Sequence, residues 1–167
     1  MPLESDAELS SVFERTRAIA VLGAKDRPGE DAWAVPKYLE RAGYTIRAVN
    51  PVIARWGDAE AWPTLAALPE RVDLIDVFRA PAHLPAHVDE ILALPWRPDC
   101  VWFQLGIRHD ACAARLEAAG IAVVQDLCIM VEHRRLASFA QRAQVSRSEP
   151  QASEDHQVGE RRPSGGR

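Results

Sequence analysis

Short apolar runs alternate along this chain with longer segments whose apolar residues recur at helical spacing. A short, continuously apolar run is typical of a parallel strand that helices cover on both faces. The alternation therefore predicts an α/β fold with a doubly wound, mainly parallel five-stranded sheet, helices on both faces and right-handed crossovers. The predicted strands are Ala18–Leu22, Thr45–Val49, Leu74–Phe78, Cys100–Phe103 and Ile121–Val124.

Helical patterns fill the intervals between these runs. They comprise a short N-terminal helix around Leu9 and Phe13, followed by Val35–Ala42, Pro81–Ala93, Asp110–Ala119 and Ile129–Gln141. Gly43 and Gly120 each follow a predicted helix, where a left-handed cap is favoured. Pro36 is expected near the start of its helix, where the missing N–H costs little. The stretch around Thr64–Leu68 is less regular and predicts one helical turn.

The length of 167 residues fits one domain with a substantial core. We predict this domain over residues 1–142, with the short N-terminal helix included. From residue 143 onward the chain is rich in Ser, Glu, Arg, Gly and Pro and has almost no large apolar residues. Such a composition buries too little surface to offset the entropy of ordering, so residues 143–167 are predicted to form a disordered tail.

Charge, hydropathy and cysteine usage argue against several classes of protein. The net charge of -4 argues against a general nucleic-acid binder. No apolar run approaches the roughly 18 residues of a membrane helix, and the N-terminus does not resemble a signal peptide. Cys100, Cys112 and Cys128 lack zinc-like spacing. An odd number of cysteines and no export signal favour reduced thiols and a cytoplasmic location.

The distinctive polar residues gather where the predicted strands end, at the edge where such sheets bind ligands. "LGAKDRPG" closes the first strand. The backbone of Gly23 can pass close to a ligand, and the following amides, with Lys25 and Arg27, can hold a diphosphate. A side chain at position 23 is expected to obstruct the ligand but leave the domain folded. The pattern G-x-G-x-x-G is absent, so a plain strand-to-helix turn remains the alternative.

The other strand ends carry further candidates, each with a structural alternative. Asn50-Pro51 is either a turn or a ligand contact. Asp76 lies inside an apolar strand, where a buried, hydrogen-bonded structural role is favoured over a site role. Arg79 is either a solvated charge or a donor to phosphate. Gln104 and Gly106 are turn residues or ligand contacts.

Catalytic machinery is not evident in the pattern. His133, in a helical stretch, is expected at the surface or as a cap, because it has no acid–base partner in sequence. Cys128 is expected to be buried, with a crevice-facing thiol as the alternative. No catalytic triad, metal-ligand cluster or paired-carboxylate motif is found. The sequence therefore indicates binding more than it indicates a reaction.

Taken in order, four segments resemble the small bacterial CoA-binding proteins. They are "IAVLGAKDRPGEDAWAVPKYLERAGYTIRAVNP", "PTLAALPERVDLIDVFR", "VWFQLGI" and "AGIAVVQDLCIMVEH". The single Rossmann-like domain of that family is similar to the CoA-binding module of succinyl-CoA synthetase alpha subunits and of acyl-CoA synthetases. The resemblance covers about Val12 to Leu136.

The resemblance implies that coenzyme A, or an acyl-CoA, lies across the strand ends. Gly23-Ala24-Lys25 would take the phosphates, while Asn50-Pro51 and Phe78-Arg79 would flank the adenosine or pantetheine portion. The full set of candidate residues is Gly23, Ala24, Lys25, Arg27, Trp33, Asn50, Pro51, Phe78, Arg79, Gln104 and Gly106. Trp33 stands where the family leads us to expect a tyrosine. The phosphorylated histidine of the synthetases belongs to another domain, which argues against ligase activity in this chain alone.

Two rival functions use the same fold. An NAD(P)-binding oxidoreductase or redox sensor would want a carboxylate at the end of the second strand, where Asn50-Pro51 stands instead. A regulatory subunit would act through a partner protein that supplies the chemistry. The prediction is a nucleotide-binding domain that holds CoA or a CoA thioester and has no clear catalytic residues.

Overall fold

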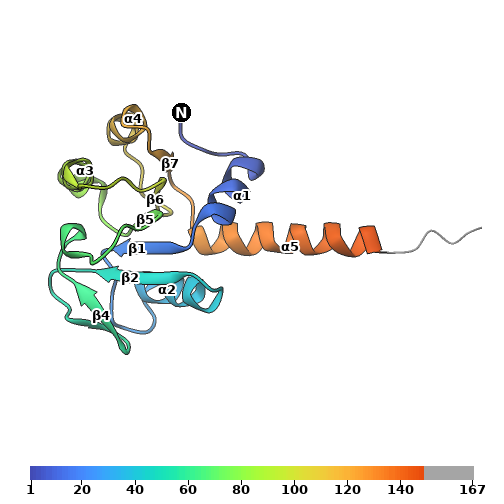
Figure 1. Cartoon of the computed structure of the whole chain (residues 1–167), viewed down its shortest axis with the longest axis horizontal. Coiled ribbons are helices and arrows are strands. Elements are labelled where there is room, and N and C mark those ends of the chain that lie inside the picture. Colours follow the sequence, from blue (N-terminus) through green and yellow to red (C-terminus); the bar gives the residue numbers. More distant parts are fainter. Residues whose placement is uncertain (149–167) are drawn as a thin grey trace, which may run out of the picture.

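The computed structural model describes residues 1–148, with side chains through residue 142 (Figure 1). Within these residues the chain forms seven strands, five α-helices and two short 3-10 turns. The strands are β1 (Ala18–Leu22), β2 (Thr45–Val49), β3 (Arg55–Trp56), β4 (Ala59–Trp62), β5 (Leu74–Val77), β6 (Cys100–Phe103) and β7 (Ala122–Val124). The helices are α1 (Asp6–Arg15), α2 (Asp31–Arg41), α3 (Leu84–Ala93), α4 (Asp110–Ala118) and α5 (Ile129–Ser148), with turns η1 (Leu65–Ala67) and η2 (Pro81–His83).

All strands join one sheet in the order β3-β4-β2-β1-β5-β6-β7. Every pairing is parallel except that of β3 with β4. From β1 the chain builds outward in both directions, with β2 on one side and β5 on the other. The predicted α/β, doubly wound class is confirmed, and the strand order reverses beside β1, where open α/β sheets bind ligands.

The sheet has two more strands than the predicted five. β3 and β4 form a hairpin in which Arg55 pairs with Glu60 and Trp56 with Ala59, around the two-residue turn Gly57-Asp58. Gly57 has a φ of +60°, as tight hairpin turns require of a central residue. This glycine-containing pair was the sequence signal for the hairpin, although the surrounding segment was predicted only as irregular.

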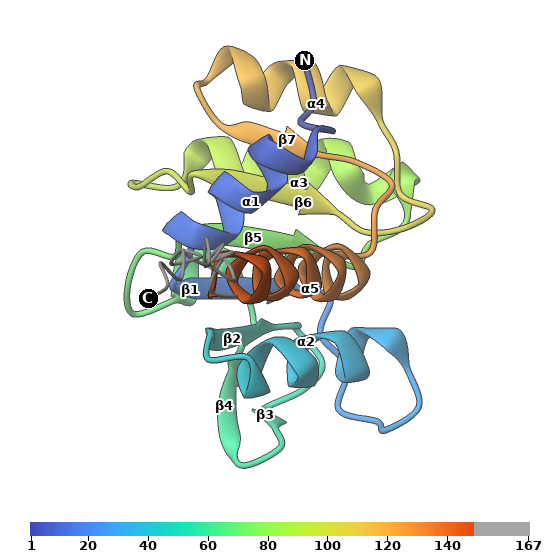
Figure 2. The same cartoon turned by 90° about the vertical axis from the view of Figure 1, so that its right-hand side faces the viewer.

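Helices cover both faces of the sheet because each central strand is apolar on both sides. On β1, Ile19 and Val21 pack with α1, α2 and α5, whereas Ala20 and Leu22 pack with α3 and α4. Figure 2 shows α1, α2 and α5 in front of the sheet and α3 behind it. Alternate residues of one strand thus serve two separate cores, which is the arrangement that the continuous apolar runs predicted.

Helix α2 begins at Asp31, so Pro36 lies inside the helix and not near its start. The expectation from sequence was wrong because the helix gains a first turn from Asp31 to Ala34. Proline has no N–H to donate to the carbonyl four residues earlier, that of Ala32. That carbonyl accepts a hydrogen bond from the backbone N–H of Lys25 instead, at 3.1 Å. The proline thereby leaves an acceptor that anchors the loop between β1 and α2.

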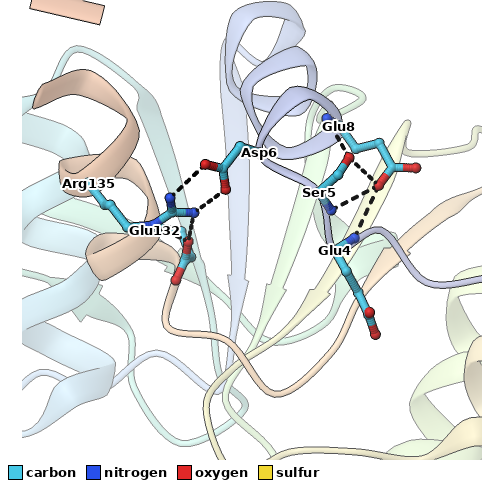
Figure 3. A network of polar contacts seen from close by, with 6 residues as sticks. All are labelled: Glu4, Ser5, Asp6, Glu8, Glu132 and Arg135. Atoms are coloured by element: carbon cyan, nitrogen blue, oxygen red, sulfur yellow. Dashed lines mark hydrogen bonds and ion pairs between the residues drawn. The ribbon is translucent and has the colours of Figure 1, made fainter. Parts of the chain in front are cut away.

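A polar network ties α1 to α5 (Figure 3). Ser5 and Glu8 form a capping box at the start of α1. The guanidinium of Arg135 on α5 donates to both carboxylate oxygens of Asp6, at 2.9 and 2.7 Å, and to Glu132 at 2.7 Å. The hydrogen bond from Arg135 lowers the pKa of Asp6. The N-terminal helix is therefore held on the domain, on the face that α5 covers.

Helix α5 continues to Ser148 and projects beyond the rest of the fold (Figure 1). The predicted domain end at residue 142 therefore falls within this helix. The remainder of the predicted tail, residues 149–167, lies outside the described residues. None of the helices in residues 1–148 combines the length and the apolar character needed to cross a membrane.

Candidate functional site

A cavity of about 480 Å³ opens at the carboxyl ends of β1, β5 and β6, beside the point where the strand order reverses. Its walls are mostly apolar, with a few polar side chains among them. The apolar side chains come from Ala32, Val35, Phe78, Ala80, Leu105, Ile107 and Met130. The lining is completed by Gly23, Lys25, Glu30, Asp31, Arg79, Gln104 and Cys128. We call this space the inner cavity.

A second cavity of about 350 Å³ adjoins the inner cavity and shares Lys25 and Glu30 with it. We call it the outer cavity. Its other lining residues are Asp26, Arg27, Asn50, Val52 and Ile53. The surface of the outer cavity is mainly polar and that of the inner cavity mainly apolar, so the two adjoining cavities differ chemically.

Gly23 directly follows β1 and lies against the backbone of Phe78, which directly follows β5. It has a φ of +91°, and a Cβ built on it would lie 2.4 Å from the carbonyl oxygen of Phe78. The same Cβ would lie 3.2 Å from Nε of Arg79. Both a left-handed backbone and a lack of space therefore require glycine here. The structure corrects the expectation that a side chain at position 23 would disturb only the ligand, because the first atom it meets belongs to the protein's own backbone.

The loop after Gly23 is held by hydrogen bonds from distant segments. The N–H of Gly23 donates to the carbonyl of Val49 at 2.9 Å. The side-chain amide of Asn50 donates to the carbonyl of the fully buried Ala24 at 2.8 Å. Together with the Lys25–Ala32 hydrogen bond, these contacts engage two of the loop's amides within the protein. Ala24 and Asn50 therefore hold the loop, and the side chains of Lys25 and Arg27 are presented from it.

Three cations surround the two cavities. Lys25 and Arg27 are exposed, and Arg79 is half-buried. None of the three takes part in an ion pair with another described residue. Nε of Arg79 is buried without a hydrogen-bond partner. Their charge is available to an anion in direct contact. The carboxylates of Asp26, Glu30 and Asp31 also line the cavities, so the formal charges of the lining side chains cancel.

Four of the predicted residues line neither cavity, and the buried Ala24 is one of them. Trp33 packs on Trp56, with ring centroids 5.5 Å apart. Pro51 is exposed at the turn after β2. The N–H of Gly106 donates to the carboxylate of Asp126 at 2.6 Å. The structure brings Gly23, Lys25, Phe78, Arg79 and Gln104 together at the inner cavity, and Lys25, Arg27 and Asn50 at the outer one.

Several lining residues were not predicted from sequence. Val35 and Met130 belong to helices whose docking on the strand ends no local pattern encodes. Leu105 is 69% exposed beside the turn at Gly106, and its exposure is not visible in the sequence. Cys128 is half-buried and lines the inner cavity. The favoured expectation of a buried Cys128 was therefore wrong, and the alternative, a cysteine at the crevice, is the one observed.

Asp76 is a buried carboxyl group that is hydrogen-bonded to Gln104, a lining residue of the inner cavity. It is 0% exposed, and its Oδ1 accepts a hydrogen bond from Nε2 of Gln104 at 2.6 Å. Its Oδ2 is buried and has no hydrogen-bond partner among the residues that the structure describes. Burial raises the pKa of Asp76 to about 7, against a smaller lowering by the hydrogen bond from Gln104. Asp76 is thus buried and hydrogen-bonded, which is the role that the sequence favoured. Its one side-chain partner, Gln104, lines the inner cavity.

His133 lies away from these cavities in an aromatic cluster. Its Nδ1 is 2.8 Å from the hydroxyl of Tyr38, and its ring stacks edge-on with Phe13 and Tyr44 at 5.0 and 5.5 Å. Burial lowers the pKa of His133. The prediction of a surface or capping histidine was wrong, because aromatic side chains of α1 and α2 pack around the ring.

Comparisons with known proteins identify the family and fold to which this chain is similar. The family model described as "CoA binding domain" matches residues 17–134. The uncharacterized protein YneT of Bacillus subtilis is 33% identical over 129 residues, which are 77% of this chain and 94% of YneT. A solved structure from Thermus thermophilus, described as cell-free ID.343, has a TM-score of 0.75 and 45% identity, over 80% of this chain and 99% of that one. A hypothetical protein from Pyrococcus horikoshii has a TM-score of 0.76 and 27% identity, over 82% and 96% of the two chains.

Proposed function

This chain belongs to the CoA-binding domain family, and we propose that it binds coenzyme A, or an acyl-CoA, across the ends of β1, β2, β5 and β6. The observation that carries the proposal is the pair of adjoining cavities with contrasting linings, joined at Lys25 and Glu30. The family match spans every strand that contributes to them.

The two ends of coenzyme A differ in the same way as the two cavities. One end is a nucleotide with several negatively charged phosphate oxygens, and the other is an uncharged pantetheine arm that ends in a thiol. We place the nucleotide in the outer cavity, where Lys25 and Arg27 offer charge-assisted hydrogen bonds to phosphate. The pantetheine arm enters the inner cavity, where Phe78, Ile107 and Met130 provide apolar contacts. Arg79, which lines the inner cavity, would contact the phosphates from the side of that cavity.

We assign a binding role to this site and no chemical step. A catalytic nucleophile is normally activated by a base within hydrogen-bond distance. Among the described residues that line the cavities, no hydrogen bond joins Cys128 to a base, and Asp76 reaches the cavity only through Gln104. A partner protein that adds a reaction, and the cytoplasmic location, remain predictions from the sequence.

Ligand preference tests the proposal against its nicotinamide rival. A ligand that binds only the folded protein at 100 times its dissociation constant adds about 2.7 kcal/mol of stability. We therefore expect coenzyme A to raise the melting temperature measurably and NAD, at the same concentration, to raise it little. Differential scanning fluorimetry followed by calorimetric titration makes the comparison. An equal or larger shift with NAD would replace the CoA assignment by the dinucleotide one.

Substitution of the cations tests where the phosphates lie. Lys25→Ala and Arg79→Ala are each expected to weaken coenzyme A about tenfold, since a hydrogen bond to a charged group contributes about 1.5–3 kcal/mol. Pantetheine, which lacks the nucleotide, should bind these variants as it binds the parent. Arg41→Ala is the matched control, because Arg41 is an exposed cation at the far end of α2. Equal losses for pantetheine and coenzyme A would mean that these side chains shape the cavity and do not contact phosphate.

A further inference from the structure

The Asp76 carboxyl group is placed so that it acts on the inner cavity through a single side chain. Asp76 lies on β5 in register with Val21 of β1 and Trp102 of β6, on the face that α1, α2 and α5 cover. Its side chain makes one hydrogen bond among the described residues, from Gln104. Gln104 follows β6 directly, is 4% exposed and lines the inner cavity.

The hydrogen bond to Asp76 decides which end of the Gln104 amide faces the cavity. A side-chain amide has two donors on its nitrogen and an acceptor oxygen. The Asp76 carboxylate can only accept once it is ionised, so this orientation, and the experiments that test it, refer to a pH above its pKa of about 7. Nε2 of Gln104 is therefore held against Oδ1 of Asp76, at 2.6 Å. Oε1 accepts no hydrogen bond from a described residue and is not among the enclosed polar atoms that lack a partner. Because Gln104 lines the inner cavity, we expect this free acceptor oxygen to face that cavity.

Core packing alone does not account for the carboxyl group. A buried polar atom without a partner destabilises a fold, and Oδ2 of Asp76 is such an atom. The neighbouring donor, Nε1 of Trp102, donates to the carbonyl of Leu127 at 2.7 Å and not to Asp76. The only described group that uses this carboxyl is a side chain of the cavity wall.

We propose that Asp76 is a positioning residue, which orients the Gln104 amide so that its carbonyl accepts a hydrogen bond from a donor on the pantetheine arm. This inference rests on the proposed function. The pantetheine arm offers three kinds of donor of suitable size, its secondary hydroxyl, its amide N–H groups and its terminal thiol. Gln104 would then favour ligands that carry such a donor at this depth, and Asp76 would act through it without contacting the ligand.

The first experiment removes the acceptor and keeps the volume. Gln104→Met is expected to weaken coenzyme A and pantetheine by a similar factor, about tenfold, as the loss of one well-placed hydrogen bond predicts. Adenosine 3′,5′-bisphosphate, which represents only the nucleotide end, should bind the variant and the parent equally. Calorimetric titration with all three probes gives these ratios. An unchanged affinity for coenzyme A in Gln104→Met overturns the inference, while failure of the parent to bind coenzyme A overturns the proposed function itself.

The second experiment tests whether Asp76 acts through orientation. In Asp76→Asn the introduced amide can either accept from Gln104 or donate to it, so the Gln104 amide populates two orientations. If one third to one half of the molecules stay competent, the affinity for pantetheine falls about two- to threefold. Adding Gln104→Glu restores a single arrangement, since the introduced asparagine amide can only donate to the new carboxylate, whose second oxygen faces the cavity as an acceptor.

We expect the double variant to bind pantetheine about as tightly as the parent does. A double variant no tighter than Asp76→Asn, or a loss in Asp76→Asn that extends equally to adenosine 3′,5′-bisphosphate, would show that Asp76 has only a structural role. S-Methyl-CoA then identifies the donor. If Gln104→Met weakens coenzyme A and S-methyl-CoA alike, the donor is an amide N–H or the hydroxyl of the arm. If it weakens only coenzyme A, the donor is the thiol.

Discussion

Gly23→Ala is expected to destabilise the protein by about 3 kcal/mol. A left-handed backbone costs an L-residue roughly 1–2 kcal/mol, and forcing a methyl group into a packed site costs about 1–3 kcal/mol more. The added Cβ would meet the Phe78 carbonyl at 2.4 Å, so the ends of β1 and β5 must separate. Each kcal/mol shifts the melting temperature of a protein of this size by about 2–4 °C. A fall of about 6–12 °C should therefore appear in a thermal melt.

Gly43→Ala is the matched control for this experiment. Gly43 has a φ of +107°, and a Cβ at that position would meet no atom within 4 Å. An alanine at this position has the same unfavourable backbone as at Gly23 but no steric clash. We therefore expect Gly43→Ala to lower the free energy of unfolding by about 1 kcal/mol. Equal losses in the two variants would mean that the contact with Phe78 relaxes freely. Gly23→Ala should also weaken coenzyme A, because the strand ends that must separate form the wall of the inner cavity.

Asp76 is expected to make the folded protein less stable as the pH rises. The pKa of this carboxyl is about 7 in the fold, against an ordinary value of 3.8. Between these values the folded state holds a proton that the unfolded state has released, so the free energy of unfolding falls as the pH increases, and it levels off above pH 7. With about 1.4 kcal/mol for each pKa unit, the loss between about pH 5.5 and pH 8.5 amounts to about 2 kcal/mol.

Asp76→Asn removes this contribution and nearly preserves the shape of the side chain. Urea denaturation at the same two pH values gives the change in the free energy of unfolding for each protein. The change in the parent minus the change in the variant is the contribution of Asp76. Burial also lowers the pKa values of His87 and His133, but both proteins carry these groups, and their effects cancel in the comparison. Parallel stability curves for parent and variant would show that Asp76 titrates in the fold as it does in the unfolded chain.

Local sequence patterns were sufficient to predict the strands that are apolar on both faces. The alternation of residues such as Ile19 and Leu22 between two cores is visible in the sequence, because burial on both faces leaves no polar position. The hairpin of β3 and β4 was missed because β4 joins the sheet by pairing with a distant segment, Ala61 beside Ala48. Its burial pattern, with exposed Ala59 and Glu60, carries little apolar signal of its own.

The sequence by itself determined the order of the elements and the edge of the sheet at which the site lies. Parallel strands place all their carboxyl ends at one edge, so Lys25, Arg79 and Gln104 were expected at the same edge of the sheet. Only the tertiary structure decided what each polar group does there. The amide of Asn50 is engaged by Ala24, 26 residues earlier, and Gln104 is oriented by Asp76, 28 residues earlier. Hydrogen bonds over such separations depend on how strands and loops pack, and short-range periodicity carries no information about them.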